Sequence, residues 1–276
     1  MTFLFAPAHE PRKTAKALAS SSPAVILDLE DAVPGDQKAA ARDAAARILA
    51  EPLSADGPAV WVRINGTDPD FERDLAAIDW SRAAGVVLPK VEDPERVIQA
   101  ERAGARSVLA LIESAAGLGA VERVATQATR VSRLAIGTYD LALDLRLWAI
   151  DDPDDSELIW QLRGELVVQS RRFGLPPPID GICARLSDNA AFERVCRRAA
   201  AMGYGGKLLI HPSQIETARS VFTPDPAALA SARRLLDAYA AATAEGRGAA
   251  RFDGRLIDRP MVERARALLE WADGSV

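Results

Sequence analysis

The chain has 276 residues, a net charge of −5 and 49% hydrophobic residues. This length fits one large domain or two small ones, and the negative charge argues against nucleic acid as the main partner. No apolar run approaches the ~20 residues that cross a membrane, and the first residues lack the basic and apolar regions of a signal peptide. The two isolated cysteines, Cys183 and Cys196, indicate a reducing cytoplasm rather than a disulfide framework.

Apolar runs alternate with helical segments over most of the chain. Eight runs have the composition of buried parallel strands: residues 3–5, 24–29, 60–64, 85–88, 108–112, 134–137, 179–183 and 207–210. Helical spacing is found between them, for example over residues 38–49, 94–103, 118–127 and 189–202. Eight strands with helical crossovers predict an α/β fold, a closed (β/α)8 TIM barrel. An open doubly wound sheet is the alternative, but no Gly-x-Gly-x-x-Gly turn follows the first strand.

The predicted barrel is complete near Phe222, so residues 1–222 form the expected catalytic domain. Residues 223–276 are expected to form a C-terminal helical extension that contacts a neighbouring subunit or the outside of the barrel. The sequence predicts helices over residues 225–242 and 260–271, and a small polar linker over residues 243–252. The acidic run 151–155 is expected to be a solvated loop, with a second cation site as the alternative.

Charged side chains follow most of the predicted strands. They are Glu30 and Asp31 after the second strand, Arg63 at the third, Lys90 after the fourth, Glu113 after the fifth, Asp140 after the sixth and His211 after the eighth. In a TIM barrel the catalytic groups lie at the C-terminal ends of the strands. Four acids and two strong cations at one mouth are typical of an active site, whereas the lone His211 predicts a structural hydrogen bond.

Glu113 and Asp140 follow neighbouring strands, so their carboxylates are expected to lie close together. Without a cation they would repel each other, and one of them would hold a proton. Mg²⁺ takes oxygen ligands and is commonly held by one or two carboxylates together with substrate oxygens, so the pair predicts a magnesium site. No cluster of cysteine and histidine suits zinc. The alternative is that each acid caps the helix that follows it.

Glu30 and Asp31 are expected to support the site by fixing metal-bound waters or Arg63, and the alternative is internal salt bridging, for example to Arg42 or Lys38. The alternation of the second strand points Asp28 into the barrel, where it needs a partner.

The guanidinium of Arg63 suits a substrate carboxylate or a developing oxyanion, and the alternative is an ion pair with Glu30 or Glu113. Lys90 is expected either to contact substrate or to pair with Asp31 or Glu92.

A series of short motifs runs through nearly the whole chain, from residue 3 to about residue 267. They include Leu4-Phe5-Ala6-Pro7 with Lys16-Ala17-Leu18, Leu27-Asp28-Leu29-Glu30-Asp31-Ala32-Val33, Val62-Arg63-Ile64-Asn65, Leu88-Pro89-Lys90, Leu111-Ile112-Glu113-Ser114, Gly137-Thr138-Tyr139-Asp140-Leu141, the stretch from Gly206 to Ile215, and Gly254-Arg255-Leu256-Ile257-Asp258. In this order they resemble the citrate lyase β-subunit-like group of the HpcH/HpaI aldolase superfamily.

The resemblance implies a TIM barrel that assembles as homotrimers or hexamers and holds Mg²⁺ through Glu113 and Asp140. It implies that Arg63, Glu113, Lys90 and Lys16 bind substrate, and that Asp258 reaches a neighbouring subunit as the acid or base at the acyl-CoA carbon. Residues 6–10 and 181–185 depart from the family pattern.

The function expected from the resemblance is that of a Mg²⁺-dependent carbon–carbon lyase with Arg63, Asp258, Glu30 and Asp31 in its catalytic machinery. Its substrate would be a β-hydroxyacyl-CoA thioester such as malyl-CoA or citramalyl-CoA, cleaved to an acyl-CoA and a 2-oxo acid, or formed from them. The alternatives are thioester hydrolysis on the same scaffold, the β subunit of a citrate lyase complex acting on a carrier-protein thioester, and a catalytically idle barrel.

Overall fold

The computed structural model describes residues 1–52, 54, 56–244 and 250–273. The chain divides into two compact units, Met1–Phe222 and Thr223–Val276. None of the described helices is long and apolar enough to cross a membrane.

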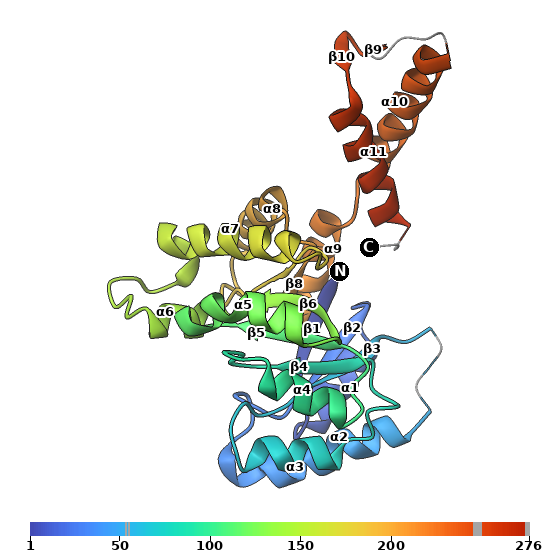
Figure 1. The fold of residues 1–276 in the computed structure, drawn as a ribbon. Coiled ribbons are helices and arrows are strands. Elements are labelled where there is room, and N and C mark those ends of the chain that lie inside the picture. Colours follow the sequence, from blue (N-terminus) through green and yellow to red (C-terminus); the bar gives the residue numbers. More distant parts are fainter. Residues whose placement is uncertain (53, 55, 245–249, 274–276) are drawn as a thin grey trace. The chain divides into compact units, whose positions relative to one another are not determined.

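The first unit is a closed barrel of eight parallel strands in sequence order, which confirms the predicted TIM barrel (Figure 1). The strands are β1 (Thr2–Pro7), β2 (Ala24–Asp28), β3 (Ala59–Arg63), β4 (Gly85–Leu88), β5 (Val108–Ile112), β6 (Val131–Ile136), β7 (Ile179–Asp180) and β8 (Gly206–Leu209). β1 pairs with both β2 and β8, and this pairing closes the barrel.

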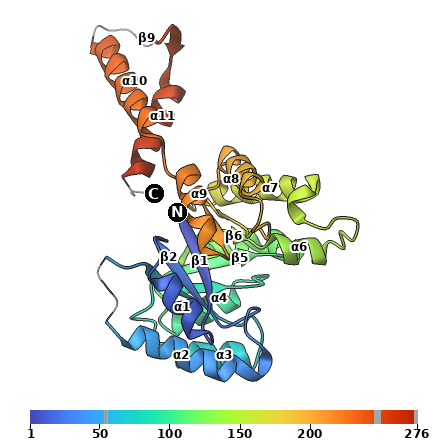
Figure 2. The ribbon, with the colours of Figure 1, turned by 180° about the vertical axis from the view of Figure 1, so that it is seen from behind.

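Helices enclose the strands of this unit, as Figures 1 and 2 show from opposite sides. They are α1 (Pro11–Leu18), α2 (Lys38–Ala50), α3 (Asp70–Ala77), α4 (Glu95–Arg102), α5 (Ala115–Gln127), α6 (Thr138–Asp144), α7 (Glu157–Arg172), α8 (Asn189–Met202) and α9 (Ile215–Phe222). Short 3₁₀ turns η1 (Gly35–Gln37), η2 (Pro153–Asp155) and η3 (Pro212–Gln214) precede α2, α7 and α9.

The strands are buried on both faces, which explains their nearly continuous apolar sequences. Ala24 and Ile26 of β2 belong to a small apolar cluster, whereas Val25 and Leu27 belong to the larger core with residues of the helices. Because side chains alternate along a strand, the small cluster fills the barrel and the large one lies beneath the helices. Asp28 continues the inward-facing set of β2 and is fully buried.

β7 is shorter than the predicted strand 179–183, because its last residues bond to side chains instead of to the next strand. Asp180 is fully buried and binds Nζ of Lys207 at 2.5 Å and Nε of Arg163 at 2.7 Å. Lys207 Nζ also donates to the carbonyl of Gly181 at 2.7 Å. The Lys207 side chain of β8 therefore binds the carbonyl of Gly181, which a longer β7 would have used for backbone pairing in the sheet.

The acidic run 151–155 is only partly the solvated loop that the sequence predicted. Asp151 and Asp155 are exposed, whereas Asp154 is buried and binds Nη2 of Arg163 at 2.6 Å. Asp152 and Asp155 bind Arg185 at 2.8 and 2.6 Å, so Arg185 joins this loop to the segment after β7. Among the described residues, no group of three or more His, Cys, Asp or Glu side chains could hold a metal ion, which argues against the alternative cation site.

The second unit contains α10 (Pro226–Ala244), the strands β9 (Ala250–Phe252) and β10 (Arg255–Ile257), and α11 (Arg259–Ala272). The two helices match the predicted ones closely. The predicted linker 243–252 was partly wrong: residues 243 and 244 continue α10, residues 250–252 form β9, and residues 245–249 lie outside the described residues. Asp253 and Gly254 both have positive φ, which suits a two-residue hairpin turn between β9 and β10. Ala242, Ala250 and Ile257 form a small core of their own.

Candidate active site at the barrel mouth

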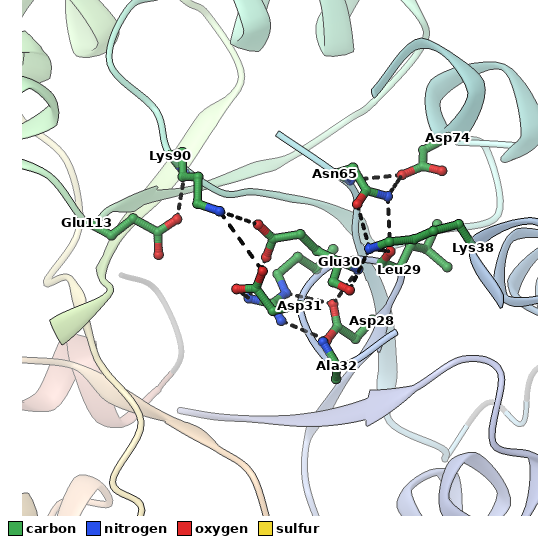
Figure 3. Close-up of polar contacts among 11 residues, drawn as sticks. Asp28, Leu29, Glu30, Asp31, Ala32, Lys38, Asn65, Asp74, Lys90 and Glu113 are labelled. Atoms are coloured by element: carbon green, nitrogen blue, oxygen red, sulfur yellow. Dashed lines mark hydrogen bonds and ion pairs between the residues drawn. The ribbon is translucent and has the colours of Figure 1, made fainter. Parts of the chain in front are cut away.

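Five charged side chains that the sequence singled out lie in one connected network at the carboxyl ends of β2 to β5. Glu30 and Asp31 follow β2, Arg63 ends β3, Lys90 follows β4 and Glu113 follows β5. Figure 3 shows Glu113 and the Lys90 ammonium on one side of the cluster and the acids of the β2 end on the other. Parallel strands bring these residues together because their carboxyl ends meet at one rim.

Arg63 is clamped from three directions. Its Nε and Nη2 donate to the two carboxylate oxygens of Asp28, both at 2.7 Å. Its Nη1 lies 2.9 Å from Oε2 of Glu30, an ion pair without hydrogen-bond geometry, and its Cζ lies 4.7 Å from the ring centre of Phe5. Burial alone would lower the pKa of Arg63, but the carboxylates of Asp28 and Glu30 raise this pKa, so the guanidinium stays charged. The guanidinium has further N–H donors on Nη1 and Nη2 that can face a bound anion.

Lys90 and Glu30 form the centre of the network. Nζ of Lys90 donates to Oε1 of Glu30 at 3.1 Å and lies 4.0 Å from Asp31. The Glu30 side chain is 6% exposed, and burial raises its pKa above the ordinary value despite Arg63 and Lys90. The Asp31 side chain is 55% exposed. Glu30 therefore holds two cations in place, whereas Asp31 faces the open mouth.

Glu30 does form the internal salt bridges that the sequence left open as the alternative, but among the described residues its partners are Arg63 and Lys90 and not Lys38 or Arg42. Arg42 binds Asp74 at 2.7 Å and Asp70 at 2.9 Å. These contacts hold α2 against α3.

Nζ of Lys38 donates to the carbonyls of Leu29 and Glu30, at 2.9 and 2.7 Å, and to Oδ1 of Asn65 at 2.7 Å. Nδ2 of Asn65 reaches Asp74 and the Leu29 carbonyl (Figure 3). These residues fix the backbone at the ends of β2 and β3.

Glu113 is the most perturbed carboxylate of the site. It is 4% exposed, and its Oε1 accepts the backbone N–H of Lys90 at 2.7 Å. Burial, and then the charges of Asp140 and Glu30, raise its pKa to about 8, although Lys90 N–H and Arg63 oppose the rise. A Cβ at position 137 would lie 2.3 Å from Oε2 of Glu113, so only glycine leaves this carboxylate its place.

Neither Glu113 nor Asp140 caps a helix, so that alternative was wrong. The side chain of Ser114 caps α5 by accepting the N–H of Gly117 at 3.0 Å. Gly137 precedes α6, and Asp140 lies within the first turn of that helix. Neither acid therefore serves as an N-cap.

The charges of this mouth fit a divalent cation. Five carboxylates face two cations: Asp28, Glu30, Asp31, Glu113 and Asp140 against Arg63 and Lys90. A buried carboxylate whose pKa is raised by a second carboxylate is stabilised in its charged form by a bound cation. Among the described residues, no three His, Cys, Asp or Glu side chains are placed to hold a metal ion together, so an ion held by Glu113 and Asp140 would need further ligands from water or substrate. Mg²⁺ accepts such a site because it keeps several waters.

Three predicted residues are not part of this network. Lys16 is exposed in the last turn of α1. Asp258 belongs to the second unit, where it is exposed and caps α11 by accepting the N–H of Met261 at 3.4 Å. Nδ1 of His211 lies 2.8 Å from Oγ of Ser213 at the start of η3, which agrees with a structural hydrogen bond.

Sequence reasoning missed the supporting Asp74 and Gly137, and it considered Lys38 only as a partner of carboxylates, whereas Lys38 binds carbonyls and Asn65. Asp74 is fully buried in α3, and it lies between the apolar Phe71 and Ile78 in sequence. A lone acid among buried apolar positions was the available signal, because such an acid must have partners. Gly137 gave no such signal, since its role depends on where Glu113 lies.

A closed (β/α)8 barrel with a clamped arginine at its mouth, and with a buried carboxylate there that feels the charge of a second one, is typical of the class of metal-dependent barrel enzymes. The model of the HpcH/HpaI aldolase/citrate lyase family matches residues 1–212, and the chain belongs to this family.

The chain is similar to named relatives over nearly its whole length. It is 37% identical to the citrate lyase subunit beta-like protein of Deinococcus radiodurans, with 96% of this chain and 95% of the relative covered. It is 33% identical to the L-malyl-CoA/beta-methylmalyl-CoA lyase and 32% identical to the (3S)-malyl-CoA thioesterase of Cereibacter sphaeroides, each with 98% and 93% coverage.

A solved structure supports the same relationship. The Mycobacterium tuberculosis protein CitE, in complex with magnesium, acetoacetate and coenzyme A, matches with a TM-score of 0.79 and 34% identity. The match covers 99% of this chain and 97% of that one.

Proposed function

We propose that this protein is a Mg²⁺-dependent carbon–carbon lyase. It cleaves a β-hydroxyacyl-CoA thioester, such as malyl-CoA or citramalyl-CoA, to an acyl-CoA and a 2-oxo acid, or runs the reverse condensation. The observation that carries the proposal is the buried Glu113, perturbed by Asp140, in one network with the clamped Arg63. The related malyl-CoA lyase, at 33% identity over 98% of the chain, supports the choice of substrate.

Glu113 and Asp140 would hold the magnesium ion. When bound, the ion would supply Lewis-acid polarisation of the 2-oxo acid carbonyl. Lys90 keeps Glu113 in position through its N–H, and Gly137 leaves room for the carboxylate. These residues orient the carboxylate before any ligand binds, which reduces the cost of assembling the site.

Arg63 stabilises the thioester enolate that forms as the carbon–carbon bond breaks. The electrons of that bond pass into the thioester, the hydroxyl group of the substrate loses its proton and becomes the carbonyl of the 2-oxo acid, and the enolate carbon gains a proton. We assign the hydroxyl proton to Asp31, because its carboxylate is more than half exposed at the mouth. Glu30 contacts protein cations only, so its contribution is to fix Arg63.

Asp258 of a neighbouring subunit would protonate the enolate carbon, and in the condensation direction it would be the base. Its exposure at the start of α11, beside the 68% exposed Leu256, supports a role at a surface between subunits. The unit 223–276 would then be an extension that contacts the next barrel in a homotrimer or hexamer. Lys16, exposed on α1, would meet the acyl-CoA thioester.

Hydrolysis of a malyl-CoA-type thioester is the second candidate, and the related (3S)-malyl-CoA thioesterase favours it. A water at the mouth would attack the thioester carbonyl, and Arg63 would stabilise the resulting oxyanion. The third candidate is a citrate lyase β subunit that acts on a carrier-protein thioester. We place the enzyme in the cytoplasm, because Cys183 and Cys196 are both buried free thiols.

Product analysis with malyl-CoA and citramalyl-CoA separates these candidates. Acetyl-CoA with glyoxylate or pyruvate indicates cleavage, whereas free CoA with malate or citramalate indicates hydrolysis. Activity is expected to vanish after treatment with EDTA and to return with Mg²⁺. Full activity in EDTA would reject the metal role, and turnover of carrier-protein thioesters alone would favour the third candidate.

Mixed oligomers test the contribution of the neighbouring subunit. Asp258→Ala and Arg63→Ala chains should each be inactive alone, and a mixture should recover part of the activity because some sites then hold both native residues. Absence of recovery in a mixture shown to exchange subunits would refute the shared site.

A further inference from the structure

We propose that Lys90 is a positioning residue with two separable parts: its backbone orients Glu113, and its ammonium holds Glu30. This inference rests on the proposed metal role of Glu113. It assigns that orientation to the left-handed turn at the end of β4, and not to the charge of the lysine.

The backbone of Lys90 has an unusual conformation. Its φ is +52°, and only Arg146 and Asp253 share a positive φ among the described residues other than glycine. A residue with a Cβ adopts this region at a cost, and such residues cluster at functional sites. Lys90 is not in a hairpin turn or at a helix end that would explain the conformation, since it follows the last residue of β4 by two positions.

The turn at Lys90 directs two successive backbone N–H groups, those of Lys90 and Val91, to different acceptors. Lys90 N–H points to Oε1 of Glu113 at 2.7 Å, and the next N–H, from Val91, bonds to the carbonyl of Leu111 in β5 at 3.3 Å. The chain thus returns to β5 after a single residue has turned its donor toward the carboxylate. With an extended backbone at position 90, the N–H of this residue would point away from Oε1 of Glu113.

The hydrogen bond leaves the other oxygen of Glu113 free to serve as a ligand. Oε2 lies against the position that a Cβ of residue 137 would occupy, at the turn that leads to Asp140. None of the described residues donates a hydrogen bond to it. One oxygen is therefore fixed by Lys90 while the second is directed toward the β6 end that carries the partner carboxylate.

The ammonium of Lys90 belongs to a different set of contacts. Nζ donates to Oε1 of Glu30 at 3.1 Å (Figure 3). Oε2 of Glu30 lies 2.9 Å from Nη1 of Arg63. The side chain is 45% exposed. Its loss would disturb the support of Arg63 but leave the backbone donor to Glu113 intact, provided that the turn is kept.

Two substitutions separate the parts, because both remove the ammonium and only one opposes the turn. Glycine adopts a positive φ freely, so Lys90→Gly keeps the N–H in place. Valine resists it strongly, so Lys90→Val works against the turn. The measurement is Mn²⁺ binding by electron paramagnetic resonance or calorimetry on the full-length protein without substrate. Circular dichroism verifies that each variant is folded, and Lys90→Thr, which is also branched at Cβ, replaces the valine variant if that one fails to fold.

The expected result is that Lys90→Gly binds Mn²⁺ as tightly as the unmodified protein, or more tightly because a nearby cation is gone. Lys90→Val is expected to bind about tenfold more weakly. Equal affinities of the glycine and valine variants would overturn the inference. Glu113→Gln tests the proposed metal site by itself. If this variant binds Mn²⁺ normally, the metal role of Glu113 fails, whereas its loss of binding together with equal Lys90 variants defeats only the present inference.

Discussion

Replacing Lys38 with methionine should loosen the end of β2 by an amount that the contacts allow us to work out. Nζ of Lys38 has three acceptors, but two of them keep another donor. The Leu29 carbonyl still accepts Nδ2 of Asn65, and the Glu30 carbonyl still accepts the N–H of Val33. Only Oδ1 of Asn65 loses its one donor among the described residues.

A buried acceptor without a donor costs about 1–3 kcal/mol, and each lost hydrogen bond with a remaining donor costs about 0.5–1 kcal/mol. The variant Lys38→Met should therefore be less stable by about 2–5 kcal/mol. For a domain of this size, that loss lowers Tm by about 4–20 °C. Turnover should fall as well, because Glu30 and Arg63 depend on this end of β2.

Thermal unfolding followed by circular dichroism measures the effect, with Lys13→Met as the matched control. Lys13 pairs with Glu10 at 2.7 Å on the surface, with side chains 63% and 38% exposed. A surface pair of this kind contributes about 0–1 kcal/mol, so the control should change Tm by only a few degrees at most. Equal shifts for the two variants would refute the reasoning, because the convergence of buried acceptors on Lys38 would then carry no weight.

Gly137→Ala should weaken Mn²⁺ binding at least tenfold, because the new Cβ would collide with Glu113. Gly119→Ala is the control and should bind Mn²⁺ normally, because no atom lies within 4 Å of its new Cβ. Equal Mn²⁺ binding by both variants would contradict the assignment of Glu113 to the metal site. Asp180→Asn should cost about 3–5 kcal/mol, because buried Lys207 is left without a carboxylate and buried Arg163 keeps only Asp154, whereas Asp155→Asn at the surface should cost less than about 1 kcal/mol. Burial alone would raise the pKa of Asp180, but its two cations outweigh burial and hold the pKa below the ordinary value. The stabilisation is therefore present above about pH 4 and is lost as the pH falls further, and thermal melts from pH 3 to 7 should show the two proteins converging at the acid end. Both cysteines are buried and have raised pKa values, about 12 for one of them, so a thiol reagent at pH 8 should label them only on unfolding; fast labelling of the native protein would contradict their burial.

The barrel could be predicted because its signal is local. Each strand is an apolar run with helical segments on both sides, and the number and order of these runs already indicate a closed parallel barrel. β4 (Gly85–Leu88) and β5 (Val108–Ile112) have the predicted bounds, and the other strands differ from their predicted bounds at one or both ends. The largest error in a strand boundary, at the end of β7, involves residues from other elements. β7 ends at Asp180, whose side chain binds Lys207 and Arg163.

The sequence predicted which charged residues form the network at the barrel mouth, but it predicted only partly which of them bind each other. Acids and cations at the ends of strands are visible in the sequence, and Glu30, Arg63, Lys90 and Glu113 do lie in one network. The partner of Arg63 was open between Glu30 and Glu113. The structure adds Asp28, whose need for a partner was visible in the strand alternation.

The sequence by itself determined the barrel and the set of charges at its mouth, because the burial of strands leaves a periodic trace and polar residues interrupt it where each strand ends. Only the tertiary structure decided which charges meet. Lys38 binds carbonyls instead of carboxylates, Lys90 turns its N–H to Glu113 in a left-handed conformation, and Gly137 leaves room for that carboxylate. Such choices depend on the distances between strand ends that are far apart in the chain, and local periodicity carries no record of those distances.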